Sequence, residues 1–328
     1  MSKEIKKNQI ISITGATATG KTNLALQVAE ALAQKKPTSK IYLLSVDSRQ
    51  VYQGLEILTG ADLPHGWQVK RKQPYRHWQH PELKISLHGV SIVPIWQDWS
   101  AAHFKKLYLS LKEKLRHQDY LILVGGTGFY HRQIEAGADS LFIPQDQKLR
   151  QRYSQKSVAF LQEKLKQLDS EKLANMNRSD ANNPRRLIRA IEIAQFLKTQ
   201  DNNSTQTKKQ AREEILKIHL ELNRHDREEK IIRRVEGRFK HAIHEVRACL
   251  KEFKLAQQLP AASATGFQEL AGLINHDLKQ EQALKKWILS EIQYAKRQDT
   301  WWNKVSDLNV FRADDPELLK KSLALIGD

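Results

Sequence analysis

Short apolar runs alternate with amphipathic stretches in the first part of the chain. Three runs have the length of a strand: residues 9–13 (QIISI), 41–46 (IYLLSV) and 120–124 (YLILV). Between them, residues 23–32 and 101–115 carry apolar side chains at helical spacing. Buried strands separated by helices are typical of a parallel sheet covered on both faces. The pattern therefore predicts an α/β fold, with residues 8–142 forming the first part of its core.

The pattern changes after about residue 137. Stretches rich in Gln, Lys and Leu, without β-branched runs, predict a small all-helical insertion over residues 143–182. Residues 183–326 are expected to complete the core and to be mostly helical. Their first helix opens at Asn183, a suitable N-cap, followed by Pro184 in the first turn. A strand is expected at residues 216–222.

Two further stretches have no helical or strand periodicity. Residues 64–94 are expected to be irregular, and their scattered histidines have no spacing suited to metal ligands. Residues 200–209 are rich in Asn, Ser, Thr and Gln, which predicts a flexible loop.

Residues 15–22, GATATGKT, match the phosphate-loop pattern G-x-x-x-x-G-K-[ST] at every fixed position. The match lies between a predicted strand and a predicted helix, as this motif requires. Its glycines let successive N–H groups point at phosphate oxygens, and the helix start adds a positive dipole end. A glycine turn with a solvated lysine is the alternative. The expected phosphate-binding residues are Gly15, Ala16, Thr17, Ala18, Thr19, Gly20, Lys21 and Thr22.

This motif predicts a P-loop NTPase-like fold and a ligand that carries a diphosphate or triphosphate. Lys21 would reach the outer phosphate, and the Thr22 hydroxyl would hold Mg²⁺. The third predicted strand is followed by Gly125 and Gly126 and has no aspartate at its end. That ending weakens a nucleotide-hydrolysis interpretation, because an ATPase carries its second magnesium ligand there.

Polar residues follow the second and third predicted strands. Asp47 comes directly after one and Thr127 after the other. Because ligands of open α/β sheets sit beyond the carboxyl ends of the strands, both should lie on the rim of the phosphate loop. Asp47 could act as a general base or bind magnesium, or it could cap a helix. The sequence leaves these alternatives open.

The composition points to a polyanionic partner. Lys and Arg number 54 against 37 Asp and Glu, which gives a formal net charge of +17. A generally basic soluble surface would explain the charge equally well. The single cysteine, Cys249, excludes an internal disulfide and fits a reducing, cytoplasmic location. We expect no membrane span, because no apolar run approaches about 18 residues.

Basic residues recur in three later stretches. Arg185, Arg186 and Arg189 can share one helix face, and another basic helix includes Arg238. Residues 296–302 combine basic and aromatic side chains, which suits single-stranded nucleic acid. For each stretch, a solvated basic surface is the ordinary alternative.

In this order, these stretches resemble the tRNA dimethylallyltransferase family, also called tRNA isopentenyltransferases, in its bacterial form. The matching segments are GATATGKT, VDSRQVYQGLEI, VGGTGFY, NPRRLIRAIEI, RRVEGRF, TGFQEL and QYAKRQDTWWN. They extend across residues 10–303, and coincidence does not explain so many segments in the same order.

The resemblance implies a reaction in which dimethylallyl diphosphate donates its prenyl group to the N6 amine of the adenosine immediately 3′ of the anticodon in tRNA. The released product is diphosphate, and the cofactor is Mg²⁺. By this resemblance Asp47 is the catalytic base, Thr127 holds the acceptor adenosine, and Arg238 adds a cation at the diphosphate.

The resemblance also implies which residues bind tRNA. The helical insertion would contact the anticodon stem, and the enzyme would act as a monomer. The matched positions are Asp47, Ser48, Arg49, Gln50, Thr127, Arg150, Arg185, Arg186, Leu187, Ile188, Arg189, Ser263, Ala264, Thr265, Gly266, Phe267, Gln268, Lys296, Arg297, Gln298, Asp299, Thr300, Trp301, Trp302 and Asn303.

The chain departs from the family pattern at several points. A lysine usual shortly after Ile57 is missing, and the segment after Arg238 is several residues shorter. Asp299 and Asn303 stand where apolar and basic residues are commoner. Two other interpretations remain at this stage: an ATP-dependent small-molecule kinase of the P-loop class, and a non-catalytic RNA-binding protein.

Overall fold

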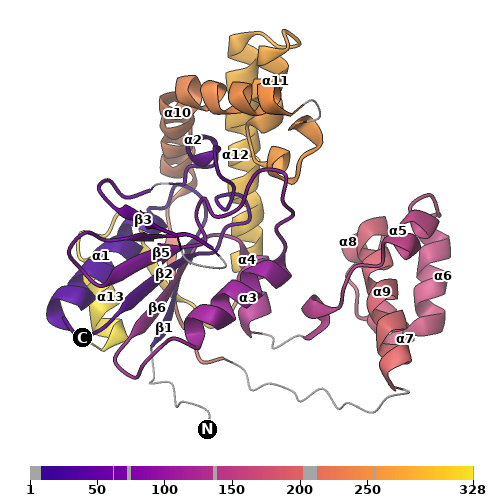
Figure 1. Cartoon of the computed structure of the whole chain (residues 1–328), viewed down its shortest axis with the longest axis horizontal. Coiled ribbons are helices and arrows are strands. Elements are labelled where there is room, and N and C mark those ends of the chain that lie inside the picture. Colours follow the sequence, from indigo (N-terminus) through magenta and orange to yellow (C-terminus); the bar gives the residue numbers. More distant parts are fainter. Residues whose placement is uncertain are drawn as a thin grey trace. The chain divides into compact units, whose positions relative to one another are not determined.

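The chain forms two compact units. A computed structural model describes residues 9–61, 63–71, 75–135, 139–201, 213–253 and 256–327. Residues 1–136 and 213–328 make up the larger unit, and residues 137–212 make up the smaller one (Figure 1). No helix in the described part of the chain is long and apolar enough to cross a bilayer.

The larger unit is built on one mixed sheet. Its strands are β1 (Ile10–Gly15), β2 (Ile41–Ser45), β3 (Gln68–Lys70), β4 (His77–Gln79), β5 (Ile85–His88), β6 (Tyr120–Val124), β7 (Leu216–Glu221) and β8 (Asn309–Arg312). Their order across the sheet is β3-β4-β5-β2-β6-β1-β7-β8. From β5 to β8 every neighbouring pair is parallel, and β3-β4-β5 are antiparallel. The predicted α/β fold is thereby confirmed.

The expectation of irregular structure over residues 64–94 was wrong. Three strands lie there, and β5 pairs in parallel with β2 in the buried centre of the sheet. These strands are only three or four residues long, so they show too few periods to be recognised from hydropathy alone. Of the loop expected at residues 200–209, residues 202–209 lie outside the described part.

Helices cover the sheet and extend beyond its carboxyl ends. Those of the larger unit are α1 (Lys21–Lys35), α2 (Glu56–Thr59), α3 (Ala101–Lys112), α4 (Gly128–Glu135), α10 (Arg224–Glu252), α11 (Phe267–Ile274), α12 (Gln280–Trp302) and α13 (Leu318–Ile326). The short 3-10 turns η2 (Ala256–Gln258) and η3 (Pro260–Ser263) precede α11. Helices α1 and α13 pack together, while α10, α11 and α12 gather with α2 beyond the strands (Figure 1).

The two faces of β1 have different chemistry because its side chains alternate. Ile11 and Ile13 enter the apolar core with α1. Ser12 and Thr14 point to the other face, where Ser12 Oγ bonds His131 Nδ1 at 3.0 Å and Thr14 Oγ1 bonds His219 Nδ1 at 2.9 Å. The strand that leads into the phosphate loop therefore rests on a hydrogen-bonded polar layer.

Trp302 packs against this polar layer. Its ring packs against His131 and His219, with ring centroids 5.2 and 5.6 Å apart, respectively. His131 also bonds the carbonyl of Gly125 through Nε2, at 3.2 Å. Burial lowers the pKa of His131 to about 3 and that of His219 to about 4, so both rings are neutral at pH 7.

The smaller unit is helical, as expected, but it extends beyond residues 143–182. It contains η1 (Asp139–Phe142), α5 (Gln147–Tyr153), α6 (Val158–Leu168), α7 (Ser170–Ala174), α8 (Arg178–Ala181) and α9 (Pro184–Asp201). Helix α9, which we had expected to begin the completed core, belongs here because Leu187 and Ile191 share an apolar core with Leu161 and Leu165 of α6. The amide oxygen of Asn183 accepts from Arg185 N, as predicted for the N-cap.

Acid should destabilise the larger unit through His131. The native pKa is about 3 against an ordinary 6.5, so the unfolded chain binds more protons between these values. This contribution to stability is therefore complete above pH 6.5 and falls by about 1.4 kcal/mol per pH unit below it. In urea titrations from pH 4.5 to 7.5, His131→Gln should flatten the pH dependence of the unfolding free energy. The exposed His65→Gln is the control, and equal slopes in wild type and His131→Gln would contradict the assignment.

Candidate active site

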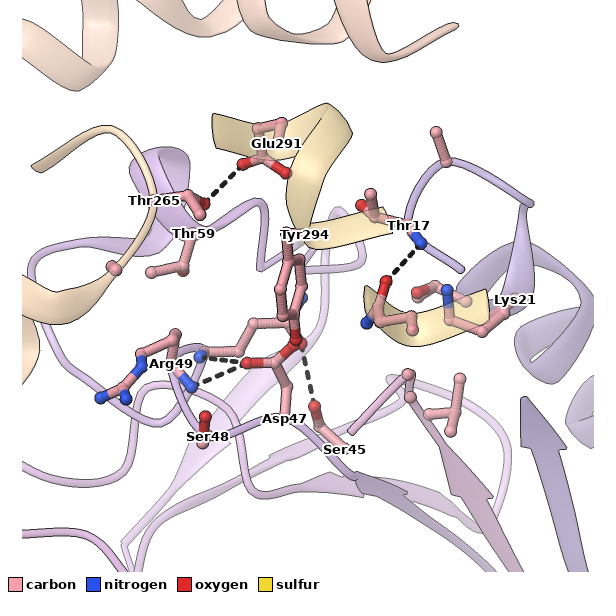
Figure 2. A pocket seen from close by; sticks show the side chains of 18 of the residues that line it. Thr17, Lys21, Ser45, Asp47, Ser48, Arg49, Thr59, Thr265, Glu291 and Tyr294 are labelled. Carbon is pink, nitrogen blue, oxygen red and sulfur yellow. Dashed lines mark hydrogen bonds between the residues drawn. The ribbon is translucent and has the colours of Figure 1, made fainter. Parts of the chain in front are cut away.

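A cavity of about 550 Å³ opens at the carboxyl ends of β2 and β6, between the phosphate loop and helices α10 and α12. Its walls carry six cationic side chains and two carboxylates: Lys21, Arg49, Lys230, Arg234, Arg238 and Arg297, with Asp47 and Glu291. All of these residues belong to the larger unit. Figure 2 shows this site from close by. The excess of positive charge suits an anionic ligand.

Three residues of the phosphate loop have a positive φ. Gly15, Ala18 and Gly20 have φ values of 143°, 65° and 83°. A Cβ on Gly15 would lie 2.5 Å from the carbonyl oxygen of Leu220, so this position requires glycine. Within the described residues, the N–H groups of Ala18, Thr19 and Gly20 have no protein acceptor. They are therefore available to an anion.

Lys21 and Thr22 stand where the motif places them. The ammonium group of Lys21 folds back over the loop and donates to the carbonyl of Ala16 at 2.5 Å. Thr22 lines the cavity beside it. Within the described residues no group of three His, Cys, Asp or Glu side chains could hold a metal ion. A Mg²⁺ ion here would depend on Thr22 and on oxygens of its ligand.

Asp47 lies at the rim of the phosphate loop, as expected, and its carboxylate also makes capping hydrogen bonds. Its Oδ1 accepts from the N–H groups of Arg49, at 2.7 Å, and Gln50, at 3.3 Å, as a capping aspartate does. The segment it caps is a turn and not a helix. The carboxylate also lines the cavity (Figure 2). Capping thus fixes its orientation without removing it from the site.

Tyr294 of α12 reaches down toward Asp47 (Figure 2). Burial and the negative charge of Asp47 raise the pKa of its phenol well above the ordinary value of 10. Among the described residues, Thr127 Oγ1 is buried without a hydrogen-bond partner of standard geometry, yet it lies close enough to Tyr294 to lower that pKa slightly. A buried hydroxyl without a partner is suited to a ligand.

Helix α10 contributes a row of cations to the cavity. Arg238, the predicted cation, donates to the carbonyls of Ile57 and Leu58, each at 3.3 Å, and lies 3.8 Å from the Glu291 carboxylate. Arg234 lies nearer to the phosphate loop: it donates to Thr17 Oγ1 at 3.3 Å and to the Gly60 carbonyl at 3.0 Å.

The sequence interpretation missed Arg234 and Lys230 as individual site residues. Their spacing contained the signal, because Lys230, Arg234 and Arg238 stand at i, i+4 and i+8 on one helix face. Glu291 and Tyr294 were also missed. They stand seven and four residues before Gln298, so the periodicity of α12 could have grouped all three.

Helix α12 makes a direct contact with the phosphate loop. The Thr17 N–H donates to Gln298 Oε1 at 2.8 Å (Figure 2). Seven residues earlier, the largely buried Glu291 accepts from the Thr265 hydroxyl at 2.7 Å. Helix α12 therefore ties the phosphate loop to the segment before α11.

The residues implied to bind tRNA fall into an outer and an inner group. In the larger unit, the exposed ones are Ser263, Gln268, Lys296, Arg297, Thr300 and Asn303. The side chains of Ala264, Phe267, Gln298 and Trp302 are buried, and Gly266 is buried with a positive φ of 90°. Ser48, Thr265, Asp299 and Trp301 are half-buried, and Arg49 is bonded to the Pro260 carbonyl at 3.2 Å. Only six members of this set in the larger unit are therefore exposed, and five are buried.

In the smaller unit, Arg185 and Arg186 are exposed, whereas Leu187 and Ile188 lie in the apolar core. Arg150 and Arg189 both bind the buried carboxylate of Glu192. Although burial opposes it, their hydrogen bonds hold the pKa of Glu192 below its ordinary value. Arg150 thereby joins α5 to α9, whereas Arg189 lies on α9 and binds the carbonyls of Ser140 and Ile143 in the segment before α5.

The departures from the family pattern leave the local structure intact. Helix α10 continues without a break through the shortened segment after Arg238. Near the missing lysine, Glu245 accepts from the N–H groups of Ile57 and Leu58 at 2.9 and 2.8 Å and so caps α2. Asp299 forms an ion pair with Arg227 at 2.7 Å.

Comparisons with known proteins identify a family and several relatives. The IPP transferase family model matches residues 50–305. The tRNA dimethylallyltransferase 2 of Phocaeicola vulgatus is 31% identical over 300 residues, which cover 91% of this chain and 89% of the relative. The tRNA dimethylallyltransferase of a Nocardioides species is 26% identical over 327 residues, or 98% and 96% of the two chains.

A solved structure shares the fold. The tRNA delta(2)-isopentenylpyrophosphate transferase of Staphylococcus epidermidis superimposes with a TM-score of 0.61 at 26% identity, covering 97% of this chain and 98% of that one. With a family match over residues 50–305, a P-loop sheet and one cationic cavity that includes Asp47, the chain belongs to the IPP transferase family.

Proposed function

We propose that this protein transfers the dimethylallyl group of dimethylallyl diphosphate to the N6 amine of the adenosine immediately 3′ of the anticodon in tRNA, releasing diphosphate. The observation that carries the proposal is a cavity lined by the phosphate loop, by Asp47 and by the cations of α10. Family membership supplies the reaction class. It does not support the alternative of an ATP-dependent small-molecule kinase.

The donor's diphosphate is expected against the phosphate loop. The N–H groups of Ala18, Thr19 and Gly20 would bind its oxygens, and Lys21 would exchange its bond to the Ala16 carbonyl for one to phosphate. Arg234, which contacts the loop at Thr17, and Arg238 line the same cavity from α10. As the C–O bond of the donor breaks, negative charge accumulates on the diphosphate, and these groups would stabilise it.

Magnesium fits the site only together with the donor. Mg²⁺ commonly takes one or two protein ligands and completes its shell with phosphate oxygens and water. The Thr22 hydroxyl, which lines the cavity, would be the protein ligand. When bound, the ion would neutralise part of the charge on the leaving diphosphate.

The acceptor side is assigned to Asp47. The N6 amine attacks C1 of the prenyl group, the C–O bond to diphosphate breaks, and the N6 proton passes to Asp47. Backbone N–H groups hold Oδ1 of Asp47, which leaves Oδ2 for this proton. Thr127 would hold the adenosine through its buried hydroxyl. The base must leave the anticodon stack to reach these groups.

We propose that exposed cations guide the RNA to the cavity. In the larger unit these are Lys296 and Arg297, and in the smaller unit they are Arg185 and Arg186. The smaller unit would contact the anticodon stem. A tRNA substrate implies that the protein acts in the cytoplasm, and we expect it to act as a monomer.

Asp47→Asn should abolish prenyl transfer while leaving both substrates bound. Asparagine keeps the oxygen that accepts from Arg49 and Gln50, but it cannot take a proton, so kcat should fall about 10²–10⁴-fold. The assay follows radiolabel from dimethylallyl diphosphate into an unmodified anticodon stem-loop, with labelled ATP in parallel. Near-normal turnover of Asp47→Asn would rule out Asp47 as the general base. If the wild-type protein consumes ATP without labelling RNA, the kinase interpretation is restored.

Arg234→Ala should raise the KM for the donor about 10- to 100-fold, because a hydrogen bond to a charged group contributes about 1.5–3 kcal/mol. The matched control is Arg233→Ala, the adjacent arginine on the exposed side of α10, which pairs with Glu229. It should leave the donor KM within twofold of wild type. Equal effects of the two substitutions would mean that Arg234 acts only through the overall charge of the helix.

A further inference from the structure

The last two turns of α12 present two different faces. Lys296, Arg297 and Thr300 are exposed, whereas Gln298 and Trp302 are only 6% and 2% exposed. The family resemblance implies that the whole segment binds tRNA. Because its amide is buried, Gln298 presents almost no surface to RNA, and its contacts have to be explained within the protein.

The Gln298 amide lies between two glycine-containing turns. Its Oε1 accepts from the Thr17 N–H of the phosphate loop at 2.8 Å. Its Nε2 packs so closely on the turn after β6 that a Cβ on Gly126 would lie 2.1 Å away. On the next turn of α12, Trp302 donates through Nε1 to the Gly126 carbonyl at 3.4 Å. One helix end thus holds the phosphate loop against the turn that precedes Thr127.

We propose that Gln298 is a positioning residue of the donor site. By accepting from Thr17 N–H, it fixes the first half of the phosphate loop, so that the free N–H groups of Ala18, Thr19 and Gly20 face the diphosphate. That this diphosphate belongs to the prenyl donor rests on the function proposed above. Although Gln298 also lines the cavity, its amide oxygen is already engaged by the Thr17 N–H.

The chemistry of the side chain fits this role. The half-buried Thr17 N–H gains its protein acceptor from Gln298. Glutamate would accept equally well, but it would place a negative charge beside a bound diphosphate. A neutral amide supplies the acceptor without repelling the ligand. Glutamine is therefore the side chain that satisfies the loop and tolerates an anion.

The test compares Gln298→Met with Gln293→Met, an exposed glutamine on the same helix. Methionine keeps the volume and removes the acceptor. Inorganic pyrophosphate is the probe, and its affinity is measured by titration calorimetry. We expect about 10-fold weaker binding by Gln298→Met and no change in the control. Hydrogen exchange of the peptide containing residues 15–22 should accelerate in Gln298→Met alone. In turnover, the donor KM should rise while the KM for tRNA stays within twofold.

Two results would overturn the proposal. One is an unchanged pyrophosphate affinity in a Gln298→Met protein whose thermal unfolding shows it to be folded. The other is weaker RNA binding with a lower salt slope and intact pyrophosphate binding, which would make Gln298 a direct RNA contact. Failure of the proposed function is distinguishable, because wild-type protein would then transfer no prenyl group while its pyrophosphate affinity still depended on Gln298.

Discussion

Unpaired backbone N–H groups in the phosphate loop are the feature on which the rest of the site depends. The chain leaves β1 at Gly15 against the carbonyl of Leu220 and turns through left-handed residues before α1 begins. Three amides are left without a protein acceptor within the described residues. Such amides can bond to water or to an anion, and the surrounding elements hold the loop in place.

Two sets of contacts support the phosphate loop. Beneath the loop, Ser12 and Thr14 bond two buried neutral histidines, so the polar face of β1 is satisfied without a charge. Beside it, Arg234 of α10 and Gln298 of α12 contact Thr17. Residues more than 200 positions apart in sequence therefore contact the same loop. Asp47 and Thr127 follow β2 and β6, and β6 lies between β2 and β1, so both residues belong to the same edge of the sheet as the loop.

Sequence alone predicted the parts of the site that are local. The phosphate loop, Asp47 and Thr127 each follow a buried strand, and parallel strands bring their carboxyl ends to one edge. The short strand β5 could not be recognised, because its burial comes from pairing with β2 and not from its own pattern. Arg234 could not be distinguished from the other basic residues of α10, because charge alone does not show which face of the helix contacts the phosphate loop. Likewise, the sequence around Gln298 is typical of an RNA-binding segment. Only the structure shows that one side of this segment is exposed and the other side buried.

The central claim is that donor and acceptor meet in the one cavity between the phosphate loop and Asp47. A crystal structure with an anticodon stem-loop and a thiolo analogue of dimethylallyl diphosphate, which resists cleavage, tests it most directly. The account predicts the diphosphate between residues 17–22 and the α10 cations, with the adenosine N6 within hydrogen-bond distance of Asp47. A diphosphate bound away from the loop, or an adenine beyond the reach of Asp47, would contradict it.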